Sequence, residues 1–139
     1  MATRPVSLRI PDGDRQNIEE ISRRTGRDFS SVANEMLAEA VKMRRIPGII
    51  FADSPSGRVA RIAGTGIEVY EVVRSYWGLD RDWDELRNAY HWLTELQLRA
   101  ALAYAEAYPK EIGERIEADE RWTPEEVWLK YPFTRPRKP

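Results

Sequence analysis

Residues 4–10, Arg-Pro-Val-Ser-Leu-Arg-Ile, alternate between polar and apolar side chains, which predicts a β-strand with one buried face. No partner strand follows it, because the residues up to 45 show helical periodicity instead. A lone strand cannot satisfy its backbone N–H and C=O groups. The simplest solution is pairing with the same strand of a second copy of the chain, with Val6, Leu8 and Ile10 facing a shared core.

The other face of this paired strand would carry Pro5, Ser7 and Arg9 twice, once from each chain. A two-stranded ribbon whose outer face is small, polar and basic can enter the major groove of DNA. The alternative is that Arg4, Ser7 and Arg9 are ordinary solvated residues, but that alternative does not explain what pairs with the strand. The formal net charge is only −1, so any DNA-binding surface must be local.

The composition narrows the classes of function. The chain has 139 residues, no cysteine and one histidine, so we expect no disulfide, no cofactor, no metal site and no enzymatic activity. Its apolar runs are too short for a membrane helix or an export signal, so we expect a cytoplasmic protein. Basic residues outnumber acidic ones within residues 1–45 and are outnumbered by them within 46–139, which favours a nucleic-acid surface in the first third.

Two helices are expected after the strand. The first should cover about 13–25, with Ile18 and Ile21 as a thin apolar stripe and Gly26 as its C-terminal stop. The second has an apolar stripe at i, i+3 and i+4 spacing, formed by Val32, Ala33, Met36, Leu37, Ala40 and Val41. A segment this short rarely buries enough surface to be stable alone, which also favours an intertwined dimer.

Residues 3–45 are thus expected to form a strand, a helix, a glycine turn and a second helix that Ser30 or Ser31 can cap. In the order and length of these elements, roughly residues 3–45 resemble the ribbon-helix-helix family of DNA-binding proteins. The resemblance implies that outward strand residues contact bases and that the N-terminus of the second helix holds a DNA phosphate, where free N–H groups favour an anion. The residues assigned to DNA binding in this way are Thr3, Arg4, Pro5, Ser7, Arg9, Ser30 and Ser31. Pro5 departs from the hydrogen-bonding residue usual at its position and has no N–H group.

The middle segment, residues 46–113, predicts a β-hairpin followed by three helices. The two strand-like runs and the turn between them are residues 49–52, 58–62 and 53–57. The helices are expected at about 68–77, 82–90 and 94–108. Thr94 and Gln97 have the spacing of a capping box, and so do Asp82 and Glu85; Pro109 ends the third helix.

Residues 62–69 (IAGTGIEV), 93–95 (LTE) and 100–105 (AALAYA) resemble a domain of uncharacterised molecular role that occurs in VapB-like antitoxins and is grouped with helix-turn-helix folds. The resemblance covers about 46–113. The solvent face of the helix that starts at Thr94 is mixed in charge rather than basic, so we favour a protein or dimer contact over a second DNA contact. Its alanine-rich side, Ala100, Ala103 and Ala107, would allow another helix to approach closely.

Residues 114–139 are expected to form a C-terminal tail that binds a partner. The alternating charges between Lys110 and Arg121 predict a solvated helix that extends away from the body, and Thr123 and Pro124 begin a further helix. The aromatic residues that follow are too many for a free disordered tail, so they either fold back onto the core or dock onto a partner. We favour the partner, with contacts from Trp122, Trp128, Tyr131, Phe133, Arg135 and Arg137.

Together the two resemblances imply an antitoxin that binds its own operator DNA as a homodimer and represses its operon. In VapB-like families the C-terminal segment wraps a toxin, usually a ribonuclease of the PIN type, whose metal-binding carboxylates could face Arg135 and Arg137. The alternative is a transcriptional regulator without a toxin, whose second domain assembles dimers on DNA. The expected fold is mainly α, with a ribbon-helix-helix domain (1–45), a hairpin with three helices (46–113) and a helical tail (114–139).

Overall fold

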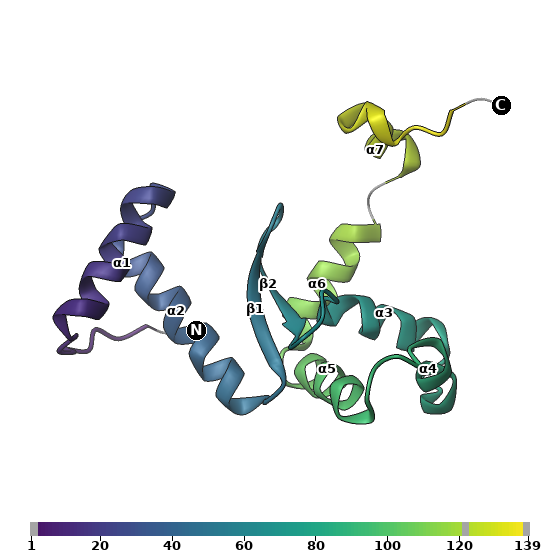
Figure 1. Cartoon of the computed structure of the whole chain (residues 1–139), viewed down its shortest axis with the longest axis horizontal. Helices are drawn as coiled ribbons and strands as arrows, with labels where there is room; N and C mark the ends of the chain where they lie inside the picture. Colours follow the sequence, from purple (N-terminus) through teal and green to yellow (C-terminus); the bar gives the residue numbers. More distant parts are fainter. Residues whose placement is uncertain (1–2, 121–122, 138–139) are drawn as a thin grey trace. The chain divides into compact units, whose positions relative to one another are not determined.

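A computed structural model describes residues 3–120 and 123–137 of the chain, shown in Figure 1. The chain divides into two compact units, with the division between Arg44 and Arg45. The described residues are mainly helical and contain one sheet, which has two antiparallel strands. The expected class, mainly α with a small β-hairpin, is therefore confirmed.

The first unit consists of an N-terminal segment and two helices, α1 (Asp12–Thr25) and α2 (Phe29–Arg45). The division places Arg45, the last residue of α2, in the second unit. α1 ends at Gly26, which adopts the left-handed conformation with φ +68°, as predicted. Only Ile18 and Val32 are buried among the described residues of this unit. Most of the stripe predicted on α2 is exposed in the single chain.

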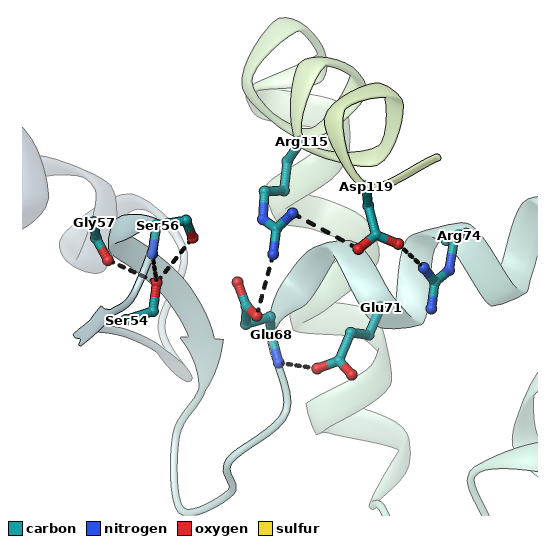
Figure 2. Close-up of polar contacts among 8 residues, drawn as sticks. All are labelled: Ser54, Ser56, Gly57, Glu68, Glu71, Arg74, Arg115 and Asp119. Carbon is teal, nitrogen blue, oxygen red and sulfur yellow. Dashed lines mark hydrogen bonds and ion pairs between the residues drawn. The ribbon is translucent and has the colours of Figure 1, made fainter. Parts of the chain in front are cut away.

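The second unit begins with the hairpin formed by β1 (Ile49–Ser54) and β2 (Gly57–Ile62). Ser54 pairs with Gly57, so the connecting turn has two residues, and Gly57 has φ +110°, a conformation that glycine adopts readily. The Ser54 hydroxyl donates to the Gly57 carbonyl at 2.9 Å and accepts the N–H of Ser56 at 3.2 Å (Figure 2). The predicted hairpin is confirmed.

Three helices follow the hairpin: α3 (Val69–Gly78), α4 (Trp83–Ala89) and α5 (Glu95–Ala107). The Asp82 carboxylate accepts the N–H of Glu85 at 3.1 Å and thus caps α4. Thr94 and Gln97 form the predicted capping box of α5, with hydrogen bonds of 3.1 and 2.8 Å. These helices lie where the sequence predicts them.

The next helix, α6 (Pro109–Glu120), corrects one expectation. Ile112 and Ile116 are only 4 % and 5 % exposed, and α6 packs against α3 and α5. The predicted solvated helix that extends away from the body is therefore wrong. These two isoleucines lie one helical turn apart and form a narrow apolar stripe, which the surrounding charges obscure in the sequence. The expected boundary after residue 113 falls inside this helix.

The C-terminal part holds α7 (Pro124–Lys130) and a 3-10 turn, η1 (Pro132–Thr134), which contact each other. Thr123 caps α7 and forms a capping box with Glu126, at 3.2 and 3.0 Å, and Pro124 takes the first helical position. The helix start predicted at Thr123 and Pro124 is therefore confirmed.

The hydrophobic core lies in the second unit. Hairpin residues Ile49 and Ile62 meet side chains from α3, α5 and α6, and Tyr104 of α5 is fully buried among them. Ala100 packs against Gly48, where an added Cβ would lie 3.5 Å from that of Ala100. Over residues 3–120 and 123–137, no helix is long and apolar enough to cross a lipid bilayer.

Candidate nucleic-acid interface and partner-binding surfaces

The N-terminal segment carries the residues expected to contact DNA bases, and all of them are exposed: Thr3, Arg4, Pro5, Ser7 and Arg9. Residues 3–11 have no regular secondary structure within one chain. The apolar side chains between the polar ones are exposed too, Val6 by 83 % and Leu8 by 67 %. The strand at 4–10 is thus absent from the single chain, and its pairing with a second copy stays a prediction.

An apolar groove runs between this segment and the two helices of the first unit. Its volume is about 450 Å³, and its lining includes Leu8, Ile10, Ile18, Ala33, Met36 and Leu37. The structure thus brings together two of the three inward residues of the predicted strand, Leu8 and Ile10, and part of the stripe predicted on α2. The exposed fractions of Met36, Leu37 and Val41 are 42, 53 and 55 %. Such a surface on a small unit is typical of an interface.

The N-terminus of α2 differs from the expectation. The helix starts at Phe29, and the Asp28 carboxylate accepts the N–H of Ser31 at 2.7 Å, so Asp28 is the cap and the prediction of Ser30 or Ser31 as the cap is wrong. Hydrogen bonds from the backbone and hydroxyl of Ser31, together with the charge of Arg27, lower the pKa of Asp28. A DNA phosphate at Ser30 and Ser31 would meet this carboxylate, which makes them weaker candidates than the N-terminal segment.

The C-terminal residues expected to bind a partner are mostly exposed. The exposed fraction is 85 % for Phe133 and 41 % for Tyr131, and the two rings meet edge to face at 6.0 Å. Trp128 is half-buried, and Arg135 and Arg137 are exposed. Trp122 lies outside the described residues. The described aromatics of this tail therefore do not join the core of the second unit.

A network of charged side chains joins α6 to α3 (Figure 2). Arg115 lies 3.7 Å from a Glu68 carboxylate oxygen and 4.0 Å from one of Asp119, which also pairs with Arg74. Glu71 accepts the backbone N–H of Glu68 at 2.8 Å, so Glu68 both begins α3 and holds α6. These contacts fix one face of α6 on α3.

Tyr70 lies beneath this network. The guanidinium carbon of Arg115 is 4.1 Å from the centre of the Tyr70 ring, a distance typical of a cation–π contact. Burial raises the pKa of the Tyr70 hydroxyl, and the charge of Arg115 partly opposes that rise. The phenol therefore stays neutral at physiological pH.

Sequence reasoning missed this network, because its members lie far apart in the chain. Arg74 and Asp119 are separated by 45 positions. The one local signal in the sequence was the isoleucine pair of α6, which indicates that one face of this helix is buried. Charged residues on such a helix must then pair with residues of α3 or remain in water.

A cleft of about 310 Å³ opens beside the network, between the hairpin, α3 and α6. Its apolar lining consists of Phe51, Val59, Ala60, Tyr70 and Ile112. The charged residues that line it are Arg58, Glu68, Glu111, Glu114 and Arg115. Over the described part of the chain, no group of three or more His, Cys, Asp or Glu residues is placed to hold a metal ion.

The fold and these surfaces define a mainly helical protein with two units, of which the first is thinly packed and the second is built around a hairpin. Residues 55–105, from the hairpin turn through most of α5, match a family described as a protein of unknown function (DUF433). No curated protein and no solved structure gives a significant match to the chain. The match leaves the first unit, α6 and the tail outside the family's range.

Proposed function

We propose that this protein is a DNA-binding antitoxin that represses its own operon as a homodimer and neutralises a nuclease toxin through its C-terminal part. The observation that carries the proposal is the structure of the first unit. It has a pair of helices, an alternating segment before them and an apolar groove that a single chain leaves uncovered.

The dimer follows from the small core of this unit. Ile18 and Val32 are its only buried apolar residues in the described range, whereas Leu8, Leu37 and Val41 are more than half exposed. A segment of this size rarely folds stably without disulfides, metals or association, and the chain has no cysteine. Pairing residues 4–10 of two chains would satisfy their backbone groups and cover the groove.

The DNA-binding surface follows from the dimer. With Val6 and Leu8 turned toward the partner chain, the strand period turns Pro5, Ser7 and Arg9 outward. Two antiparallel strands then present two copies of Arg9, whose guanidinium can donate two hydrogen bonds to a guanine edge. This arrangement matches the resemblance of residues 3–45 to the ribbon-helix-helix family, and it predicts a palindromic operator.

The toxin-binding part is proposed from the tail and from the resemblance of residues 46–113 to a domain of VapB-like antitoxins. Exposed Phe133 and Tyr131 lie next to Arg135 and Arg137, and aromatic and arginine side chains dominate the energetics of protein interfaces. The guanidinium groups could lie against the metal-binding carboxylates of a PIN-like nuclease. Operator DNA, a second copy and this toxin are the partners proposed.

The decisive experiment is co-purification of the chain with the product of the neighbouring gene, together with two variants. Arg9→Ala should weaken operator binding and leave toxin capture intact. A chain that ends at Glu120 should do the reverse, because it keeps α6 and hence the core, whereas an end at Pro109 would remove α6. If a co-purified toxin is still neutralised by the shortened chain, the tail assignment is wrong. If no toxin is found while operator binding persists, the alternative, a regulator without a toxin, is favoured.

A further inference from the structure

We draw no further inference here: the strongest candidate, the surface patch just after α4 where the ring of Trp92 is 60 % exposed and packs against those of Tyr90 and His91, carries none, because nothing among the described residues shows what covers it.

Discussion

Asp28 places a negative charge at the N-terminus of α2, where the helix dipole is positive and where a DNA phosphate was expected. We expect Asp28→Ala to destabilise the first unit, since the Ser31 N–H loses its acceptor, and Asp28→Asn to destabilise it less, since the amide oxygen still caps. Urea unfolding monitored by helical circular dichroism, at one fixed protein concentration, measures both effects. Equal stability of the wild type and Asp28→Ala would contradict this role.

The pH dependence of this effect has a definite sign. The folded state lowers the pKa of Asp28 below its ordinary value of 3.8, so its carboxylate stabilises folding at pH values above 3.8. That stability is lost as the pH falls through the lower, folded-state pKa. The difference between the wild type and Asp28→Ala should therefore be constant near neutral pH and shrink below about pH 4. A difference that persists unchanged in strong acid would show another cause.

Arg9 is the basic residue predicted to read bases, and its side chain is exposed in the single chain. We expect Arg9→Ala to weaken operator binding by about 1–3 kcal/mol, the range of a bidentate contact to guanine. Fluorescence anisotropy with the DNA upstream of the gene, at several salt concentrations, measures this loss. Arg23→Ala, an exposed arginine on α1, is the matched control. Equal losses for both variants would indicate a general charge effect instead of base contact.

At the residue scale, the N-terminal cap of a helix was predicted correctly where the sequence offered a single capping residue before that helix. Thr94 and Thr123 each have a Gln or Glu three positions later, and both form capping boxes. At α2 the sequence-based prediction named only Ser30 and Ser31 as caps and overlooked Asp28, which lies two positions before Ser30. The helix starts at Phe29, so Asp28 occupies the position directly before it. From there its carboxylate accepts the N–H of Ser31.

At the scale of elements, α6 is the helix whose role changed most between sequence and structure. Ile116 is 5 % exposed in the core, so Ile116→Ala should lower the free energy of unfolding by about 2–5 kcal/mol. Urea denaturation measures the change. Glu120→Ala, an exposed position on the same helix, should change it by less than about 0.5 kcal/mol. If Ile116→Ala is as stable as the control, α6 does not belong to the core.

The elements themselves were largely predictable, and their packing was not. The hairpin is marked by Gly57 after a Pro-Ser turn between two strand-like runs, and α1 and α5 end where Gly26 and Pro109 stop them. The position of α6 depends on contacts with α3 that are distant in sequence, such as Arg74 with Asp119. Local patterns cannot show such contacts, so the charged cleft was missed as well.

At the scale of the whole molecule, the exposed stripe of α2 is the proposed dimer interface. We expect Leu37→Glu to convert a dimer to the 16.2 kDa single chain, because a charge would enter the shared core, and to abolish operator binding with it. Light scattering after gel filtration measures the mass. Leu96→Glu is the control, since Leu96 is 80 % exposed in the second unit. A mass that Leu37→Glu leaves unchanged would place the interface elsewhere.

Only two side chains are buried among the described residues of the first unit, which gives α1 and α2 little protection against thermal opening. If a second chain supplies the missing burial, the opening free energy of these helices depends on how many chains are present. Their amide protons would then exchange faster on dilution, while those of the hairpin and α5 would keep their rates. A cell that makes less of the protein would expose this end to proteases first, so the lifetime of the protein would depend on its own abundance.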